Sequence, residues 1–399
     1  MRPLRVVHIA TRYGTGGSER RLRDAVGALS GPRYHQHVVV GRDSDIERAL
    51  TDFAHHSVSV ERHLVRSPHP YHDLAALRRI ARLLQNDRVD VVNTCQSKAG
   101  ILGRLAARWA RVPVIFHSLT MLNFGPGFAR VSSVLFRGAE QLVGRWTDAY
   151  FVLGTQLRDQ FLAAGISIPE RYHVIRSSID VELFERTGAR GRDAARRQLG
   201  LEPDEVLIAY VGLLEQRKGV LDLPRYQRAL ERELRSPVRL LVAGEGPLRK
   251  PLESEFGAAG VTGGARFLGH TDRVAEVIAA ANCVVLLSRT EGLGQVLVQA
   301  MATRRPFVSY AVTGPAELIA LGGRGSVVAA GDWRAAARAT AALLSGEPPE
   351  PVNLEDFRNE RVRERYRSAF ESYTGALAAG GPRRRRRWRW REKRGRPSP

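Results

Sequence analysis

One carboxylate and two glycines stand together in the segment SRTEGLGQVLVQA, residues 288–300. The apolar run CVVLL precedes this segment and a helical pattern follows it, which is how a parallel strand leads into a helix. Gly292 and Gly294 allow the backbone to approach a ligand closely, and Glu291 can accept hydrogen bonds from hydroxyl groups. A capped helix start without any ligand would show the same residues, so both interpretations stay open for this turn alone.

Two further turns combine strand, glycine and helix in the same order. In RYGTGGSERRL, Gly16 and Gly17 follow a strand-like run and precede a helix, where backbone amides suit a phosphate group but packing alone also explains glycines. In VGLLEQRKGV, Lys218 follows a strand and is either a ligand-binding cation or a solvated charge. Ligands of doubly wound sheets bind beyond the carboxyl ends of the strands, where all three turns are expected.

Short apolar runs alternate with amphipathic helical patterns along the whole chain. LRVVHIA, QHVVVG, VDVVNT, PVIFHS and DAYFVLG read as strands in the first half, and EVLIAYVG, VRLLVAG, ARFLGH, CVVLL, PFVSYAV and GSVVAAG repeat the plan in the second half. Near-continuous Val, Ile and Leu strands separated by helices indicate parallel sheets covered on both faces. A chain of 399 residues suffices for two domains. We therefore predict an α/β fold of two Rossmann-like, doubly wound domains facing a central cleft.

The predicted domains are residues 1–185 and 186–352, because the charged, glycine-bearing stretch ERTGARGRDAARRQLG separates the two series of strands. A last helical pattern lies within residues 353–379 and is expected to pack back on the first domain. Two glycines and a proline end that pattern. Residues 380–399 are expected to form a disordered tail rich in arginine and tryptophan.

The bulk composition restricts where the protein works. Only two cysteines occur, Cys95 and Cys283, which excludes a disulfide framework and fits the reducing cytoplasm. No apolar run reaches the length of about 18 residues that a membrane-spanning helix needs. The N-terminus turns polar too quickly for a signal peptide. The net charge is +21, of which residues 382–399 contribute +9, so the remainder of the chain needs no special anionic partner.

Taken in order, several segments resemble the C-terminal domain of glycosyltransferase family 4, namely VGLLEQRKGV, LVAGEGPLR, FLGHTD, SRTEGLGQVLVQAMA, VTGPAELI and GSVVAAGD. GTGGSE is similar to the opening glycine turn of that family, and SKAGILGRLAAR followed by VPVIFHS is similar to its mid-domain segment. The resemblance covers roughly residues 4–345. It implies the GT-B fold, a nucleotide-diphosphate sugar as donor, and transfer with retention of anomeric configuration.

The resemblance also implies roles for particular side chains. Lys218 is expected to contact the diphosphate of the donor, Glu291 a hydroxyl group of the donor sugar, and Gln299 the ribose. Gln299 stands where the family has a second carboxylate, and a neutral hydrogen bond in its place loses only about 1 kcal/mol. The donor is further expected to contact residues at two helix starts, which are Gly16, Gly17, Gly292, Leu293, Gly294 and Gln295.

Two departures from the family pattern affect the chemistry. Leu213 stands where the family usually has an arginine, and we expect Arg217 to replace that cation. The segment HSLTMLNFG aligns with HTVHG of many relatives, so His117 matches the first histidine and Thr120 replaces the second, which contacts the donor sugar. The catalytic candidates are therefore Glu291, His117 and Thr120. Loss of an acid–base group lowers a rate by about 10²–10⁴-fold.

No metal or other cofactor is predicted. The chain has no GxxxxGK[ST] motif for a phosphate-binding loop, and its eleven histidines show no metal-ligand spacing. The acidic pair around Ser44, in the sequence DSD, reads as a turn or a helix cap rather than as a metal site. Without a metal, helix N-termini and cations must stabilise the charge that develops on the leaving diphosphate.

The tail PRRRRRWRWREKRGRPSP has three possible roles: a solvated extension, a contact with an anionic membrane surface, or a contact with nucleic acid. The resemblance favours the membrane, through residues 383–396, and makes nucleic acid a poor candidate. We expect a UDP-sugar donor and a lipid-linked phosphate or glycolipid acceptor, used in cell-envelope glycan or in glycolipid and antibiotic biosynthesis at the inner face of the plasma membrane. The alternatives are a soluble small-molecule acceptor, or a catalytically weakened family member acting as a partner or regulator.

Overall fold

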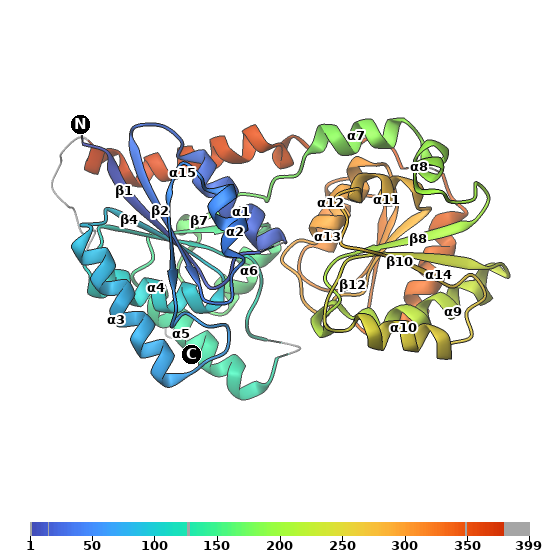
Figure 1. Cartoon of the computed structure of the whole chain (residues 1–399), viewed down its shortest axis with the longest axis horizontal. Helices are drawn as coiled ribbons and strands as arrows, with labels where there is room; N and C mark the ends of the chain where they lie inside the picture. Colours follow the sequence, from blue (N-terminus) through green and yellow to red (C-terminus); the bar gives the residue numbers. More distant parts are fainter. Residues whose placement is uncertain (1, 15, 126–127, 348, 379–399) are drawn as a thin grey trace, which may run out of the picture.

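The computed structural model describes residues 2–14, 16–125, 128–347 and 349–378. The predicted tail, residues 380–399, lies outside these ranges, as does its segment 383–396. Figure 1 shows two α/β domains beside each other, with the first half of the chain on the left and most of the second half on the right. Each domain is a parallel sheet with helices on both faces, so the predicted fold class is confirmed.

The first domain is built on a seven-stranded parallel sheet in the order β3-β2-β1-β4-β5-β6-β7. Its strands are β1 (Leu4–Ala10), β2 (Tyr34–Gly41), β3 (Ser57–Glu61), β4 (Val91–Cys95), β5 (Val114–Ser118), β6 (Ala149–Val152) and β7 (Tyr172–Val174). Its helices are α1 (Gly17–Ala28), α2 (Ile46–Asp52), α3 (Pro70–Asn86), α4 (Ser97–Trp109), α5 (Arg130–Gly144) and α6 (Thr155–Ala163), with the short turn η1 (Pro169–Arg171).

The second domain has a six-stranded parallel sheet in the order β10-β9-β8-β11-β12-β13. Its strands are β8 (Val206–Val211), β9 (Val238–Ala243), β10 (Ala265–Gly269), β11 (Cys283–Leu286), β12 (Phe307–Tyr310) and β13 (Gly325–Val328). Its helices and 3₁₀ turns are α7 (Val181–Ala189), α8 (Arg192–Leu199), η2 (Gln216–Lys218), η3 (Val220–Asp222), α9 (Leu223–Leu234), α10 (Arg249–Ala258), α11 (Val274–Ala280), α12 (Gln295–Ala302), α13 (Pro315–Ala320) and α14 (Trp333–Leu344).

In both sheets the direction of winding reverses between two central strands, β1 and β4 in the first and β8 and β11 in the second. All residues of β4 and of β11 are buried. The strand β11 is apolar, as burial on both faces requires, and the two polar residues of β4, Asn93 and Thr94, have buried hydrogen-bond partners. Crevices that bind ligands form beyond the carboxyl ends of strands at such reversals. The fold therefore places the segments after β1, β4, β8 and β11 at the candidate site.

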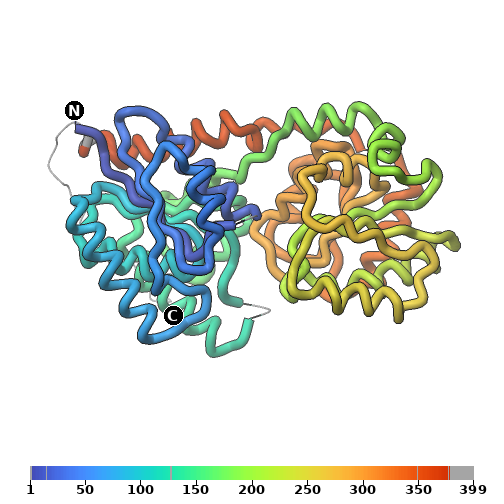
Figure 2. Tube along the Cα trace, in the orientation of Figure 1, coloured from blue at the N-terminus to red at the C-terminus, as the bar shows by residue number. Residues whose placement is uncertain are grey.

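The chain crosses between the domains twice, along one edge of the molecule (Figure 2). The first crossing precedes α7, which packs against α11 and α12, so the structure changes domain a few residues before position 185. The second follows the turn η4 (Glu355–Phe357), and α15 (Asn359–Ala378) then lies on the first domain. There the rings of Phe370 and Phe116 lie 4.5 Å apart. The crossings run side by side, because the Ile179 amide donates to the Phe357 carbonyl over 2.9 Å.

Buried polar contacts connect the two domains between α6 and α13. The Arg176 guanidinium pairs with the Glu317 carboxylate over 2.9 Å, and both side chains are largely buried. The Gln156 carboxamide accepts a hydrogen bond of 2.8 Å from the Gly314 amide, and the Gln156 amide donates to Glu317 over 3.2 Å. These contacts stabilise the relative position of the two domains.

The backbones of the two domains also touch directly, at Gly292. A Cβ atom on this glycine would lie 1.9 Å from the Thr120 carbonyl oxygen and 2.7 Å from a methyl carbon of Leu153. Real Cβ atoms do not approach other atoms so closely, so any larger residue would push the domains apart. The loop after β5 and the loop after β11 therefore meet only because residue 292 has no side chain.

We predict that Gly292→Ala opens this interdomain contact. Overpacking of this kind destabilises a protein by about 1–3 kcal/mol, so the melting temperature is expected to fall while the radius of gyration from small-angle X-ray scattering rises. Gly257→Ala is the matched control, because a Cβ atom at Gly257 in α10 would meet no atom within 4 Å. A Gly292→Ala chain with the scattering curve and melting temperature of the wild type would contradict the prediction.

Candidate active site

A buried ion pair lies where the strands β8 and β11 end. The Lys218 Nζ and the Glu291 Oε1 are 2.5 Å apart, and the two side chains are only 16% and 11% exposed. Lys218 closes the turn η2 after β8, and Glu291 follows β11. Because β8 and β11 are neighbouring parallel strands, the sheet brings together two residues that are 73 positions apart in sequence.

Gly219 fixes the lysine in this position. Its φ of +62° lies in the left-handed region, and a Cβ atom there would be 1.9 Å from the carbonyl oxygen of Leu287. The turn after β8 can therefore lie directly against the end of β11. This close approach brings Lys218 next to the segment that carries Glu291.

The pair keeps the Glu291 carboxyl group ionised. Burial alone would raise the pKa of Glu291, but the charge of Lys218 and its hydrogen bond outweigh burial and hold this pKa below its usual value. An ionised carboxylate accepts hydrogen bonds only, and an ammonium group donates three. The pair can therefore bind hydroxyl groups through Glu291 while Lys218 still has donors for an anionic group.

Arg217 and Leu213 lie near the pair, and Arg217 is predicted to replace the arginine that the family usually has in place of Leu213. Arg217 precedes Lys218, and its Nε lies 2.6 Å from the Glu215 carboxylate. Leu213 is partly exposed, and its backbone carbonyl accepts a hydrogen bond of 2.9 Å from the Tyr210 hydroxyl. The structure thus places Arg217 beside Lys218 with its guanidinium already engaged, and its role as replacement for the missing arginine stays a prediction.

The glycine turn of the first domain meets the start of α12. A Cβ atom on Gly17 would lie 3.1 Å from the Gln295 carboxamide oxygen, and the Gln295 Nε2 donates to the Ser178 carbonyl over 2.9 Å. Gly16 precedes α1 and Gly294 precedes α12, so the N-termini of these two helices lie at the interdomain contact. Their free amides are suited to an anionic ligand.

The remaining predicted donor residues lie on the same loop and helix. Leu293 is buried, because Gly314 allows the backbones to touch: a Cβ atom on Gly314 would be 2.3 Å from the Leu293 Cα. Gln299 follows Gln295 by one helical turn on the same face of α12 and is half-buried. Within the described ranges its side chain has no hydrogen-bond partner, and its predicted contact with ribose stays a prediction.

The two other catalytic candidates, Thr120 and His117, lie in different surroundings. Thr120 lies at the interdomain contact, where its carbonyl group touches Gly292. His117 lies on β5 inside the first domain and is 1% exposed. Its Nδ1 is 2.8 Å from the Thr94 hydroxyl, and burial, reinforced by the charge of Arg104, lowers the pKa of His117 well below its usual value. A neutral, enclosed imidazole contributes packing here, and its predicted catalytic role stays a prediction.

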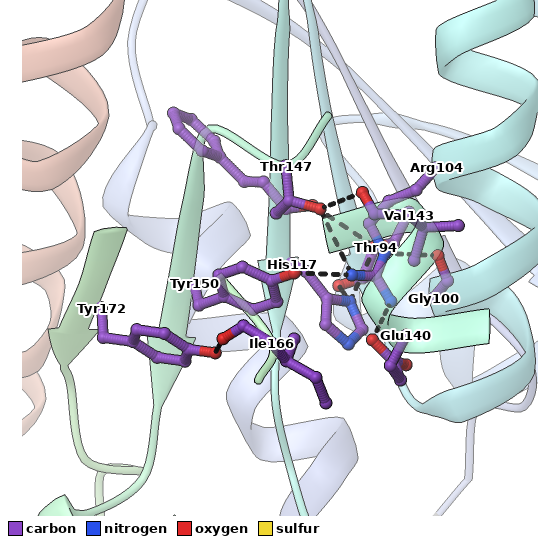
Figure 3. A network of polar contacts seen from close by, with 11 residues as sticks. Thr94, Gly100, Arg104, His117, Glu140, Val143, Thr147, Tyr150, Ile166 and Tyr172 are labelled. Atoms are coloured by element: carbon purple, nitrogen blue, oxygen red, sulfur yellow. Dashed lines mark hydrogen bonds and ion pairs between the residues drawn. The ribbon is translucent and has the colours of Figure 1, made fainter. Parts of the chain in front are cut away.

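His117 lies at the edge of a buried polar network, which Figure 3 shows. The Arg104 Nη2 pairs with the Glu140 carboxylate over 2.7 Å, and both side chains are completely buried. The Arg104 Nε donates to the Gly100 carbonyl over 2.7 Å, and a Cβ atom on Gly100 would be 2.5 Å from the imidazole. The hydroxyl of Tyr150 is 3.3 Å from Arg104. The network therefore joins α4, α5 and β6 and packs α4 onto His117.

Gln96 lies at the edge of the sheet where the site is expected, and sequence reasoning missed it. It follows β4, at the reversal of the first sheet, with a φ of +68° and a ψ of 168°, which only glycine adopts without strain. Its carboxamide accepts from the Arg12 amide over 3.1 Å and donates to the Arg12 carbonyl over 3.0 Å. Strain of this kind is worth about 1–3 kcal/mol and clusters at functional sites. The only sequence signal was its place after the run VDVVNT.

In the part of the chain that the structure describes, no group of three or more His, Cys, Asp or Glu side chains is arranged to hold a metal ion. No helix in those same ranges is long and apolar enough to cross a bilayer.

Each of the two domains matches a family model of glycosyltransferases. A model described as "Glycosyl transferase 4-like domain" matches residues 16–178, and one described as "Glycosyl transferases group 1" matches residues 191–361. The D-inositol 3-phosphate glycosyltransferase 1 of Catenulispora acidiphila is 30% identical over 305 residues, which cover 71% of this chain and 72% of the relative.

A second relative acts on a lipid-linked acceptor according to its name, UDP-Gal:alpha-D-GlcNAc-diphosphoundecaprenol alpha-1,3-galactosyltransferase of Escherichia coli. It is 24% identical over 244 residues, which cover 61% of this chain and 63% of the relative. Among solved structures, that of Anabaena HepE in complex with UDP-glucose matches with a TM-score of 0.69 and 18% identity, covering 92% of this chain and 100% of the other.

The fold is that of the GT-B class of glycosyltransferases. This class has two Rossmann-like domains that meet at the carboxyl ends of their strands, and a C-terminal helix that returns to the first domain. The chain belongs to glycosyltransferase family 4, and it is a glycosyltransferase. The three glycine turns of the sequence follow one another along the chain in the order that is typical of this family.

We predict that Lys218→Met lowers kcat/KM for the donor by about 10- to 100-fold, because a hydrogen bond to a charged group is worth about 1.5–3 kcal/mol. Removing Lys218 also removes what lowers the pKa of Glu291. The acidic limb of the pH–rate profile should therefore move to higher pH, because the carboxylate then takes up its proton at a higher pH.

Lys250→Met serves as the control for this change, because Lys250 is an exposed lysine at the start of α10. It should leave both kcat/KM and the pH profile of the wild type unaltered. If Lys218→Met also retained the wild-type acidic limb and kcat/KM, the ion pair would have no part in the active site.

We predict that Arg104→Met destabilises the protein by about 3–5 kcal/mol, because it leaves the Glu140 carboxylate buried without a partner. Arg104→Met combined with Glu140→Leu should recover most of that loss, since no charge then remains buried. The free energy of unfolding in urea, followed by circular dichroism, measures both. As a control, Arg361→Met breaks an exposed pair of similar length with Glu364 and should change stability by no more than about 1 kcal/mol. A double variant as unstable as Arg104→Met would show that packing, not charge, accounts for the loss.

Proposed function

We propose that this enzyme transfers a sugar from a UDP-sugar to a lipid-linked phosphate or glycolipid acceptor. The observation that carries the proposal is the Lys218–Glu291 pair, held at 2.5 Å beside the interdomain contact at Gly292. Its carboxylate suits the hydroxyl groups of a sugar, and its ammonium group suits a diphosphate. The similarity to a structure that holds UDP-glucose supports the choice of nucleotide.

The chemical step follows from where negative charge develops. When the bond between the sugar and the diphosphate breaks, the leaving group gains charge, and preorganised donors close to it lower the barrier most. Lys218 supplies one such donor, and the helix starts at Gly16, Gly17 and Gly294 supply backbone amides. Glu291 would orient the donor sugar so that the acceptor attacks on the face that the leaving group occupied. In this proposal the configuration is retained and no metal ion takes part.

The name of a relative supports the proposed acceptor. The Escherichia coli relative is named for a diphosphoundecaprenol acceptor, which stays in a membrane. We extend that class of acceptor to this enzyme. It would work at the inner face of the plasma membrane, in cell-envelope glycan or glycolipid biosynthesis. Residues 383–396 would contribute basic charge there. A soluble acceptor is the second candidate, because the relative at 30% identity is named for inositol 3-phosphate.

A panel of donors and acceptors tests this function. The full-length enzyme is incubated with UDP- and GDP-sugars, together with either a polyprenyl-diphosphate sugar in vesicles or inositol 3-phosphate in solution. We expect a product only from a UDP-sugar and the lipid acceptor, at a rate that EDTA does not change and with retained anomeric configuration by NMR. A product formed only from inositol 3-phosphate would replace the lipid acceptor by the soluble one, and loss of activity in EDTA would overturn the metal-free mechanism.

Calorimetric titration with UDP and with GDP separates donor binding from transfer. UDP should bind and GDP should bind at least about tenfold more weakly, a difference of about 1.4 kcal/mol. Absence of binding by both nucleotides would contradict the donor site at Lys218 and Glu291 and favour a partner role for a weakened family member.

A further inference from the structure

The Asp222 carboxylate joins three segments of the second domain. Its Oδ2 lies 2.6 Å from the Arg289 Nη2 and accepts a hydrogen bond of 2.9 Å from the Tyr310 hydroxyl. Asp222 ends the turn η3, Arg289 follows β11, and Tyr310 ends β12. One largely buried side chain, 12% exposed, thus connects the carboxyl ends of the neighbouring strands β8, β11 and β12.

Two of these segments also carry the Lys218–Glu291 pair. Asp222 follows Lys218 by four residues, and Arg289 precedes Glu291 by two. The backbone amide of Arg289 donates a hydrogen bond of 2.7 Å to the carbonyl group of Arg217. The turn after β8 and the loop after β11 are therefore joined both through the backbone and through Asp222, close to the pair.

The guanidinium group of Arg289 has defined neighbours, although 45% of the side chain is exposed. It lies over the ring of Tyr310, 5.5 Å from the ring centroid. Gly331 lies against it as well, because a Cβ atom on this glycine would be 2.8 Å from the Arg289 Nη1. Exposed ion pairs are usually weak because both side chains move, but here a ring, a glycine and a carboxylate restrict the arginine. A restricted Arg289 in turn restricts the backbone two residues before Glu291.

Tyr310 connects Asp222 to the core of the second domain. The tyrosine is completely buried and packs among the apolar side chains of the sheet. Burial, strengthened by the hydrogen bond to Asp222, raises the pKa of Tyr310, so the hydroxyl stays protonated and donates. A buried hydroxyl without a partner is costly, which favours the bond to Asp222. Asp222 is therefore tied to the sheet and not only to another loop.

We propose that Asp222 is a positioning residue for the transfer reaction. By holding Arg289 against the sheet, it keeps the loop that carries Glu291 in contact with Lys218. Asp222 has no hydrogen bond to Lys218 or Glu291, so it acts on them through Arg289. The inference rests on the proposed function, because the pair matters to catalysis only if it binds the donor.

The charge of Asp222 and its positioning role act on the pKa of Glu291 in opposite directions. Burial raises this pKa, and the contact with Lys218 outweighs burial and lowers it. Removing the negative charge of Asp222 would by itself lower the pKa further, whereas separation of Glu291 from Lys218 would raise it. The other groups that face the Glu291 carboxylate are Arg217, Ser288 and Tyr210. The direction of the change therefore distinguishes positioning from charge.

Carbon-13 NMR of the full-length chain, without any ligand, measures this direction. With labelled glutamate, the Glu291 carboxyl signal is identified by its absence in Glu291→Gln and is followed through a pH titration. Asp222→Ala should raise the pKa of Glu291 above that of the wild type. Asp222→Asn should not raise it, because the carboxamide oxygen still accepts hydrogen bonds from Arg289 and Tyr310. A pKa of Glu291 that falls or stays unchanged in Asp222→Ala would overturn the inference.

Two further variants separate positioning from a general loss of stability. Glu205→Ala breaks another ion pair of 2.6 Å in the same domain, with Arg239, at the opposite end of the sheet just before β8. It should leave the pKa of Glu291 unchanged. Tyr310→Phe removes only the hydroxyl that anchors Asp222, so it should raise this pKa, but less than Asp222→Ala does. Because phenylalanine fills the same buried space, Tyr310→Phe tests the inference even if Asp222→Ala does not fold, and an unchanged pKa would then count against it.

Kinetics with the UDP-sugar donor show whether the effect passes through the pair. Asp222→Ala should lower kcat/KM about tenfold, and Asp222→Asn no more than about threefold. In a Lys218→Met background, adding Asp222→Ala should lower kcat/KM by no more than about twofold, because the pair is already absent. A full loss of about tenfold in that background would show that Asp222 acts independently of the pair, and the inference would be wrong.

The two measurements keep this inference distinct from the proposed function, because the NMR titration requires neither donor nor acceptor. A raised pKa of Glu291 in Asp222→Ala, together with no transfer by the wild type to any acceptor, would disprove the proposed function and leave the control of the pair by Asp222 standing. Normal transfer by the wild type, together with an unchanged pKa in Asp222→Ala, would disprove the positioning role and leave the proposed function standing.

Discussion

The backbones of the two domains meet at Gly292 with no side chain between them, and the geometry of the active site depends on this contact. Glu291 immediately precedes the contact, so its carboxylate is positioned relative to both domains at once. A second close approach, at Gly219, holds Lys218 against the end of β11. The ion pair is therefore fixed from two directions by backbone packing, and its electrostatic effect on the pKa of Glu291 follows from that packing.

Much of this arrangement could be predicted from the sequence, because the central strands are mostly apolar. The run LRVVHIA corresponds to β1, and the reversal of each sheet put the glycine turns at one edge. Two edge strands were not predicted. In β3, SVSVE alternates between polar and apolar residues and is half-buried, and β7 has only three residues. Edge strands pack on fewer neighbours, so their sequences carry a weaker apolar signal.

The burial of a side chain was harder to predict than its position along a strand. His117 matches a family motif, yet the absence of a side chain at Gly100 lets α4 lie directly on the imidazole. Gln96 gave no signal beyond its place after a strand, because its residue type does not indicate a backbone conformation that normally requires glycine. In both cases the deciding contact comes from a segment elsewhere in the chain, and local patterns do not contain it.

The return of α15 to the first domain has a consequence for how the protein is made. Phe370 and Tyr366 of α15 pack on Phe116 and Phe151, which belong to the sheet of the first domain. On the ribosome, that sheet emerges long before its last helix, and the entire second domain is synthesised in between. The first domain must wait with part of its core uncovered, so its completion is coupled to the end of translation. Nascent chains that stop early would expose this aromatic surface and become targets for chaperones or proteases.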